Sequence, residues 1–256
     1  MLYDNIFKRK SYHLFRNNKT KELYKDNYHI TKEEIDNIYK FFKNIIPLYK
    51  DIKVQIKIVE ASLTNCNRGE EYVILFYSEK KDGYLENIGF IGEQLDLYLV
   101  DSNIGTLWFG IGKTSDTNYN GLDYITMMAF SKVPEDSFRK DMFKSKRKSI
   151  PEIWEGDKYQ DIANIVRFSP SSCNTQPWKV KEDNNTLLIY RYKAPNKRGI
   201  MPVKKVVYQN LIDIGIFILL LSVVLSKNGY KYSLDLFSDN ENNLDELTKI
   251  AEVIIE

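Results

Sequence analysis

Residues 169 to 178 read Ser-Pro-Ser-Ser-Cys-Asn-Thr-Gln-Pro-Trp, a dense run of hydroxyl and amide side chains with two prolines, closed by a tryptophan. Pro170 and Pro177 fix φ and lack an N–H donor, which excludes the interior of a helix. The residues between them offer short hydroxyl and amide side chains on a stiffened loop. Taken alone, such a cluster is typical of a capped turn between two secondary-structure elements.

The sequence before this loop predicts helices and strands in alternation. Thr31 and Glu34 have the spacing of a capping box, and the apolar positions that follow predict an amphipathic helix over residues 32 to 45. Further helices are expected over 91–103, ended by a left-handed Gly105, and around Ile162, Ile165 and Val166. Strands are expected over 54–58, 72–77, 106–109 and 124–130.

The sequence after the loop repeats the order of helix, Asn/Gly stop and strand. A strand is expected over 186–192, an apolar helix over 206–225 with a stop at 227–229, and a strand over 230–237. Residues 240 to 256 are expected to close the chain with a helix. Its predicted apolar face consists of Leu244, Leu247, Ile250, Ala251 and Ile254.

Composition narrows the class of protein. The chain has 256 residues, 43% of them hydrophobic, and a net charge of +2, which gives no field typical of a nucleic-acid-binding protein. Cys66 and Cys173 form no disulfide framework, so a reducing cytoplasm is the expected location. The longest apolar run, 214–225, has 12 residues, fewer than the roughly 20 that a membrane span needs, and is expected to be a buried helix.

Two basic segments are candidate anion sites. Residues 8 to 13, Lys-Arg-Lys-Ser-Tyr-His, place three cations, a hydroxyl and an imidazole within six positions, and such a group can bind a phosphate by charge-assisted hydrogen bonds. Residues 144 to 148 form a second run, Lys-Ser-Lys-Arg-Lys. A solvated charged surface is the alternative for both. The Gly-Lys-Thr at 112–114 is not a nucleotide P-loop, because Leu107 stands where its first glycine is required.

With these flanks, the loop resembles the Ser/Ala-Pro-Ser-Ser-x-Asn-x-Gln-Pro-Trp signature of the nitroreductase family of FMN-dependent oxidoreductases. Residues 9 to 15 are similar to the family's N-terminal Arg-Arg-Ser-x-Arg-x-Phe pattern, with Lys10 and His13 in place of arginine. Residues 106 to 112 resemble its glycine turn beside the flavin ring. Residues 144 to 153 resemble its Arg-Lys-Pro-Leu-Glu-Glu-Ile segment, in which Arg147 is the best match and Lys146 the second.

The resemblance implies a set of cofactor-binding residues and no side chain acting as general acid or base. The FMN phosphate would be held by Arg9, Lys10, Ser11, His13 and Arg147. The flavin ring would be bordered by Pro170, Ser171, Ser172, Asn174 and Gln176, together with the glycine turn of Gly110 and Gly112. The sequence offers two histidines and no His-Glu-x-x-His pattern, so no metal site is expected.

The resemblance also implies the fold. We expect an α+β, nitroreductase-like fold of two related halves, with mixed or antiparallel sheets covered by helices. Residues 1 to 155 would form the half with the basic segments, and residues 156 to 256 the half with the flavin loop. Because each half lacks what the other carries, the chain resembles the fused, pseudo-dimeric branch of the family, in which a monomer would suffice.

The implied reaction is a ping-pong hydride transfer. NAD(P)H would deliver hydride to the flavin and leave, and a small-molecule acceptor such as a nitroaromatic or quinone would take its place. A flavin-binding sensor or pseudoenzyme without turnover is the alternative, and Lys10 and His13 favour it slightly. Acceptor choice would depend on the loops around 113–122 and 193–205. Neither nucleic acid nor a membrane is expected as a binding partner.

Overall fold

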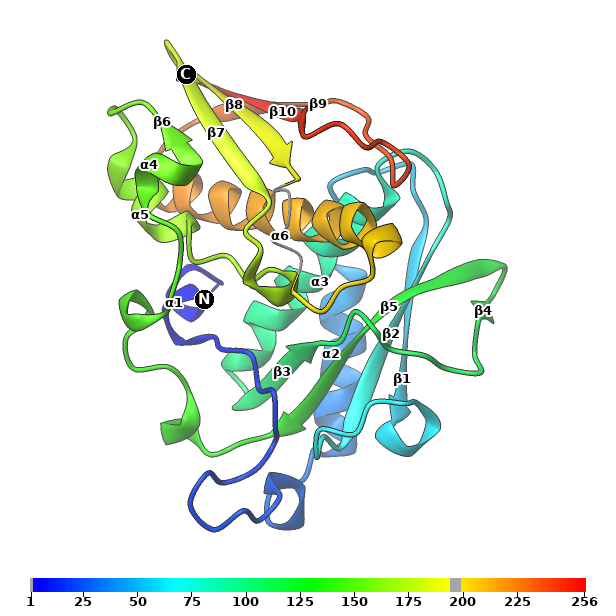
Figure 1. Ribbon diagram of the computed structural model, residues 1–256. Helices are drawn as coiled ribbons and strands as arrows, with labels where there is room; N and C mark the ends of the chain where they lie inside the picture. The colour runs from blue at the N-terminus through cyan, green and yellow to red at the C-terminus, as the bar shows by residue number, and fades with distance from the viewer. Residues whose placement is uncertain (1, 194–198) are drawn as a thin grey trace. The chain divides into compact units, whose positions relative to one another are not determined.

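The computed structural model describes residues 2–193 and 199–256 and has two compact units, each with a five-stranded sheet and helices (Figure 1). Unit 1 consists of Met1–Tyr84 and Ile91–Met142, and unit 2 of Leu85–Phe90 and Phe143–Glu256. The expected α+β class with two sheets is therefore confirmed. The assignment of 1–155 and 156–256 to two related halves, and their pairing as a pseudo-dimer, stay predictions.

Unit 1 contains an antiparallel sheet in the order β1-β2-β5-β3, with β4 paired to β5. Its strands are β1 (Val54–Glu60), β2 (Tyr72–Ser78), β3 (Ile104–Trp108), β4 (Asn118–Tyr119) and β5 (Leu122–Lys132). Its helices are α1 (Leu2–Lys8), α2 (Lys32–Lys43) and most of α3 (Tyr84–Val100), with short 3-10 turns at Tyr24–Asp26, Ala61–Leu63, Glu135–Ser137 and Met142–Lys144.

Helix α2 begins where the sequence predicts. The Thr31 hydroxyl accepts the N–H of Glu34 at 3.2 Å, and the Glu34 carboxylate accepts the N–H of Thr31 at 2.9 Å, which completes the capping box. Of the predicted apolar positions, Ile38 is buried and Tyr39 accepts a hydrogen bond from the N–H of Ile58 in β1. Phe41, outside the predicted face, stacks on Tyr98 of α3 with ring centroids 4.0 Å apart. The predicted face therefore packs as expected.

The inner strands β2 and β5 of the unit 1 sheet are buried on both faces over most of their length. Residues 73 to 78 of β2 are all buried, and Phe76 stacks on Trp108 while Tyr77 belongs to a cluster with Tyr12 and Phe15. This double burial explains why β2 is a continuous apolar run rather than an alternating one.

The expected left-handed cap at Gly105 is wrong. The residue in the left-handed region after α3 is Asn103, with φ of 54°, and Gly105 lies within β3. Asparagine tolerates this conformation better than other residues that carry a side chain. Gly105 has a different reason to be glycine, since a Cβ there would lie 2.6 Å from the ring of Tyr12.

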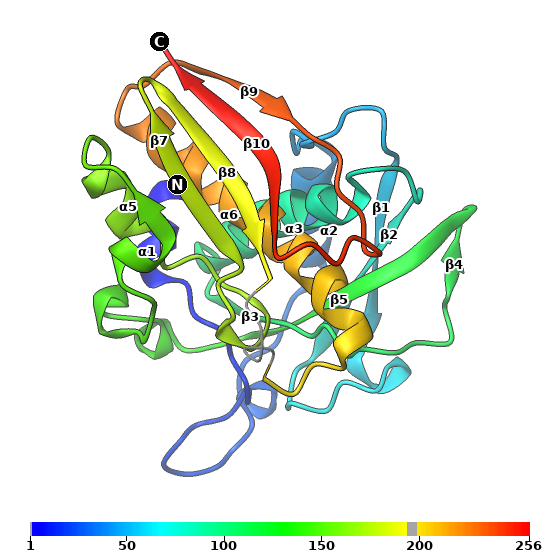
Figure 2. The same ribbon diagram turned by 45° about the horizontal axis from the view of Figure 1, so that its top comes forward.

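Unit 2 contains a mixed sheet in the order β6-β7-β8-β10-β9, in which β6 and β7 are parallel and the other pairs antiparallel (Figure 2). Its strands are β6 (Trp154–Glu155), β7 (Trp178–Asp183), β8 (Thr186–Tyr192), β9 (Tyr232–Leu236) and β10 (Leu247–Ile255). Its helices are α4 (Ile150–Ile153), α5 (Gln160–Val166) and α6 (Val206–Lys227), with short 3-10 turns at Ser172–Asn174 and Val203–Lys205.

The expected C-terminal helix over 240–256 is wrong, because residues 247 to 255 form strand β10 between β8 and β9. Ala251, Val253 and Ile255 are buried and alternate with more exposed residues, which is the period of a strand. Leu244 and Leu247, assigned to the helical core face, are 71% and 50% exposed.

Helix α6 is the expected buried apolar helix, and it ends at Lys227, within the predicted stop at 227–229. Gly229 has φ of 80°. By length and composition alone, residues 203 to 227 include a segment apolar enough to cross a membrane, but 83% of that segment is buried inside the structure. Trp178 at the start of β7 stacks on Phe217 of this helix, with ring centroids 4.9 Å apart. These contacts are those of a core helix.

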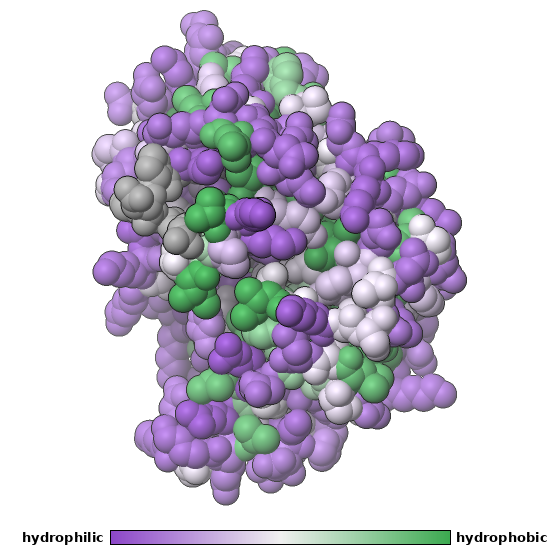
Figure 3. Space-filling view, turned by 45° about the vertical axis from the view of Figure 1, so that its right-hand side comes forward, coloured by the Kyte–Doolittle hydropathy of each residue, from purple (hydrophilic) through white to green (hydrophobic). Residues whose placement is uncertain are grey.

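The molecular surface is largely hydrophilic on the face shown in Figure 3, where hydrophobic side chains stand in small separate groups. The most exposed large apolar side chains of the described residues come from distant parts of the chain: Ile46, Leu63, Ile200, Val203 and Leu244. Isolated apolar side chains of this kind are usual on protein surfaces.

Candidate functional site

The Ser-Pro loop, residues 169 to 178, connects α5 to β7 and has an unusual backbone. Cys173, Asn174 and Gln176 have φ of 51°, 56° and 49°, so three of four successive residues are left-handed and none is glycine. This conformation costs about 1–2 kcal/mol for a residue such as Cys173 or Gln176 and less for asparagine. Backbone strain of this kind gathers at ligand-binding and catalytic sites, where surrounding structure holds it in place.

Hydrogen bonds within the loop stabilise part of this conformation. Thr175 Oγ1 donates to the carbonyl of Ser172 at 2.9 Å, and the N–H of Gln176 donates to Ser171 Oγ at 3.0 Å. Ser169 Oγ donates to the carbonyl of Val166 in α5 at 2.7 Å. The loop is therefore more than a capped turn, because its hydroxyls fix their own backbone.

A buried acid on α6 also holds the loop. The N–H of Ser172 donates to Asp213 Oδ1 at 3.0 Å, and Ser172 Oγ lies 3.2 Å from the same oxygen and 3.3 Å from Gln209 Oε1. Asp213 is 2% exposed, and burial raises its pKa to about 7 against the opposing hydrogen bonds from Ser172. Sequence reasoning missed Asp213, taking it as the end of an apolar run; the signal was an acid inside an apolar helix.

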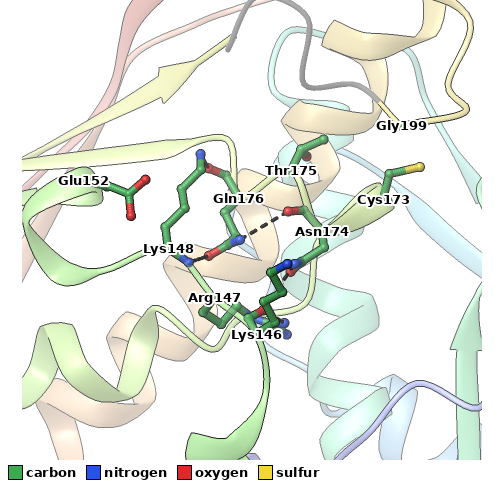
Figure 4. A pocket seen from close by; sticks show the side chains of 9 residues that line it. All are labelled: Lys146, Arg147, Lys148, Glu152, Cys173, Asn174, Thr175, Gln176 and Gly199. Atoms are coloured by element: carbon green, nitrogen blue, oxygen red, sulfur yellow. Dashed lines mark hydrogen bonds between the residues drawn. The ribbon is translucent and has the colours of Figure 1, made fainter.

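A cavity of about 370 Å³ in unit 2 joins the loop to the second basic segment. It is lined by Lys146, Arg147, Lys148, Glu152, Cys173, Asn174, Thr175, Gln176 and Gly199. In Figure 4, Glu152 and Cys173 lie at opposite ends, with Lys148, Gln176 and Asn174 between them. Three cations and one acid make the lining electropositive, which suits an anionic ligand.

Backbone and side-chain hydrogen bonds fasten the basic segment to the loop. The Lys148 N–H donates to Gln176 Oε1 at 2.8 Å, and Lys148 Nζ donates to the Gln176 carbonyl at 2.9 Å. Asn174 Nδ2 donates to the carbonyl of Lys146 at 3.2 Å, while Arg147 donates to the Lys146 carbonyl at 3.0 Å and lies over the ring of Phe168. Arg147, Asn174 and Gln176, predicted from separate motifs, thus line one cavity.

The N-terminal basic segment lies in unit 1, and its side chains differ in how deeply they are buried. Arg9 is 5% exposed; its Nε donates to Asp96 at 2.9 Å and its NH1 donates to Ser11 Oγ at 3.1 Å. Lys10 is half-buried over the ring of Tyr12, and burial, with the nearby Arg139, lowers its pKa. His13 is exposed. The Arg9 side chain is therefore already occupied by hydrogen bonds to Asp96 and Ser11.

The partners of Arg9 form a buried polar cluster on α3 and β3. Asp96 accepts a hydrogen bond from Thr106 Oγ1, and Glu93 accepts one from Trp108 Nε1 at 3.2 Å. Burial and the neighbouring Asp96 raise the pKa of Glu93 well above its ordinary value, which favours its protonated form. Asp96 is thus the carboxylate that balances Arg9.

The glycine turn after β3 is tight, as expected. The N–H of Gly112 donates to the carbonyl of Phe109 at 2.9 Å, and a Cβ on Gly112 would lie 2.4 Å from Met127 Sδ. Gly110 is exposed beside it. Packing on Met127 accounts for Gly112, and the predicted place of this turn beside a flavin stays a prediction.

The predicted residues thus fall into two groups. Unit 1 carries Arg9, Lys10, Ser11, His13, Gly110 and Gly112, and unit 2 carries Arg147, Pro170, Ser171, Ser172, Asn174 and Gln176. Their joint participation in one site stays a prediction. Among residues 2–193 and 199–256, no group of three His, Cys, Asp or Glu side chains could hold a metal ion. The loop at 113–122 is described, whereas 194–198, part of the other expected acceptor loop, lie outside the described residues.

Comparison with known proteins gives two matches. A family model described as "Putative TM nitroreductase" matches residues 1–223. A crystal structure described as a "putative nitroreductase" from Thermotoga maritima MSB8 is similar over 99% of this chain and 93% of that chain, with 18% sequence identity and a TM-score of 0.60. At that identity the likeness shows the fold alone. No curated protein matches the chain.

Proposed function

The chain belongs to the family described as "Putative TM nitroreductase", and we propose that it is an FMN-dependent oxidoreductase. It transfers hydride from NAD(P)H to a small-molecule electron acceptor such as a nitroaromatic or a quinone. Nitroreductases usually depend on a flavin. The proposal includes a monomer in the cytoplasm, in keeping with the free thiols of Cys66 and Cys173.

One observation carries the proposal: Arg147 of the second basic segment and Asn174 and Gln176 of the Ser-Pro loop line the same cavity. FMN joins a phosphate dianion to a ring with a polar edge, and the cavity offers cations for the first and amides for the second. The residues present therefore fit the cofactor. Left-handed backbone at Asn174 and Gln176 is the kind of strain that ligand sites retain.

When bound, FMN would supply the hydride chemistry, and the protein would bind and orient it. We assign Lys146 and Arg147 to the phosphate, and Asn174 and Gln176 to the ring edge. Arg9 has a supporting role, because it donates to Ser11 Oγ and so leaves the Ser11 hydroxyl hydrogen for another acceptor.

A flavin-binding protein without turnover remains the second candidate. It is favoured by Lys10 and His13 at positions where the family pattern has arginine, and by the burial of Arg9 against Asp96.

Visible absorption spectra distinguish the two candidates. The purified protein is mixed with FMN, desalted, and then treated with NADH or NADPH under anaerobic conditions. Retained flavin bands that bleach with a nicotinamide are the expected result and support the oxidoreductase. Retained bands that do not bleach would support the binding protein, and loss of all flavin on desalting would overturn both.

Arg147→Ala is expected to weaken FMN binding by roughly tenfold, because a charge-assisted hydrogen bond contributes about 1.5–3 kcal/mol. Titration by quenching of flavin fluorescence measures the effect, which should shrink as salt concentration rises. The matched control is Lys181→Ala, which removes an exposed cation of β7 paired with Glu155 at 3.2 Å. Equal losses in both variants would show that general charge, not Arg147, attracts the cofactor.

A further inference from the structure

We propose that Asp213 is a positioning residue for the Ser-Pro loop, holding Ser172 so that the left-handed residues after it keep the conformation needed for cofactor binding. The part concerning the cofactor rests on the proposed function. The part concerning the loop rests on the structure alone.

The contact joins a rigid element to the start of the strained segment. Asp213 and Gln209 lie four residues apart on α6, hence on one face, and both oxygens point to Ser172. Ser172 immediately precedes Cys173 and Asn174, the first two left-handed residues. Because α6 is a buried 22-residue helix stacked against Trp178, its side chains give the loop a fixed reference.

The hydrogen bonds from Ser172 oppose the strain of the loop. Cys173 and Gln176 are disfavoured in the left-handed region, whereas the asparagine at position 174 adopts it more readily. Hydrogen bonds inside the loop offset part of this cost, and the bonds from the Ser172 N–H and hydroxyl to Asp213 attach the loop to α6. These bonds therefore help to keep the loop from relaxing into ordinary backbone conformations.

Stability alone does not account for an acid at this position. Asp213 is 2% exposed, and its Oδ2 has no hydrogen-bond partner among the described residues. Burying a carboxylate that is not fully hydrogen-bonded costs free energy, and an apolar side chain would suit the surrounding core better. Among the described residues, the hydrogen bonds of this costly group all go to Ser172 of the strained loop, which points to a task at the loop.

Two substitutions at position 213 distinguish the loss of a hydrogen-bond acceptor from a change in side-chain volume. Asp213→Asn keeps an oxygen that can accept the N–H of Ser172, whereas Asp213→Leu fills the space and offers no acceptor. The first readout needs no flavin: the alkylation rate of the exposed Cys173 thiol, resolved by peptide mass spectrometry with buried Cys66 as internal reference. We expect the alkylation rate of Cys173 to rise about tenfold in Asp213→Leu, equivalent to about 1.4 kcal/mol, and to change little in Asp213→Asn.

The second readout is the FMN dissociation constant. It should rise about tenfold in Asp213→Leu and stay near that of the unmodified protein in Asp213→Asn. Asn210→Leu is the matched control, since it makes a polar-to-apolar change on the same buried helix at a side chain whose Oδ1 has no hydrogen-bond partner among the described residues. Should Asp213→Leu fail to fold, Ser172→Ala removes the hydroxyl from the loop side, and a rise of about threefold in thiol reactivity is then expected.

Unchanged Cys173 reactivity in both Asp213→Leu and Ser172→Ala would overturn the proposal. Faster alkylation with unchanged FMN affinity would overturn the part that concerns the cofactor. Faster alkylation in a protein whose unmodified form binds no FMN would support the positioning of the loop while overturning the proposed function, so the two failures are distinguishable.

Discussion

Arg9→Met is expected to lower the free energy of unfolding by about 4 kcal/mol, because it leaves Asp96 as a buried carboxylate without its cation. Arg9 and Asp96 are 5% and 0% exposed, and the Arg9 guanidinium approaches Asp96 through Nε at 2.9 Å and NH2 at 2.8 Å. Glu93 lies 4.0 Å from the same guanidinium and, as a second acid, supplies no positive charge in place of Arg9. Urea unfolding followed by far-UV circular dichroism measures the loss.

A double mutant tests the cause. Arg9→Met with Asp96→Asn removes both charges, and the Asn oxygen can still accept from Thr106, so more than half of the lost stability should return. Lys10→Met, the neighbouring half-buried cation, should cost less than about 1 kcal/mol. If Arg9→Met were as stable as the unmodified protein and weakened only FMN binding, Arg9 would instead be the phosphate ligand that its motif suggests.

Local signals were enough to predict much of the fold. The capping box at Thr31 and Glu34 and the apolar spacing after it locate α2 because their partners lie within the same helix. Strands β1, β2, β5 and β8 follow from short β-branched and aromatic runs.

The C-terminal segment could not be predicted in this way. Ile250, Ala251 and Ile254 match a helical spacing, but the same residues with Val253 and Ile255 also fit a strand. The structure contains the strand because β8 and β9 both pair with residues 251 to 254, and those partners come from 186–192 and 232–236. A local pattern does not reveal partners so distant in the sequence.

In the candidate site, too, contiguous motifs were predictable from the sequence and contacts between distant residues were not. The Ser-Pro loop was predictable because its signature is contiguous, and the structure brings Asn174 and Gln176 to one cavity with Arg147. The anchors were not predictable: Asp213 contacts Ser172 across 41 residues, and Asp96 contacts Arg9 across 87. Both are buried acids whose role depends on tertiary packing, which periodicity does not encode.

Gly215→Ala is expected to destabilise the protein by about 3 kcal/mol, although the same change in an ordinary helix stabilises by about 1 kcal/mol. A Cβ on Gly215 of α6 would lie 1.9 Å from the carbonyl oxygen of Glu86 in α3, and a Cβ on Gly89 would lie 2.0 Å from that of Ile212. Both obstacles are backbone atoms, so no side chain can rotate away and the two helices must separate. Thermal and urea unfolding measure the change.

Whether Gly215→Ala lowers or raises the stability of the protein is the decisive observation. Two further variants serve as comparisons. Ser226→Ala on an exposed position of α6 keeps the helix-propensity gain without the clash and should be neutral or slightly stabilising. Gly89→Ala should cost about as much as Gly215→Ala, and the double variant less than the sum, because helices already pushed apart leave room for the second Cβ. A stabilised Gly215→Ala would mean that α6 and residues 85 to 90 do not cross this closely.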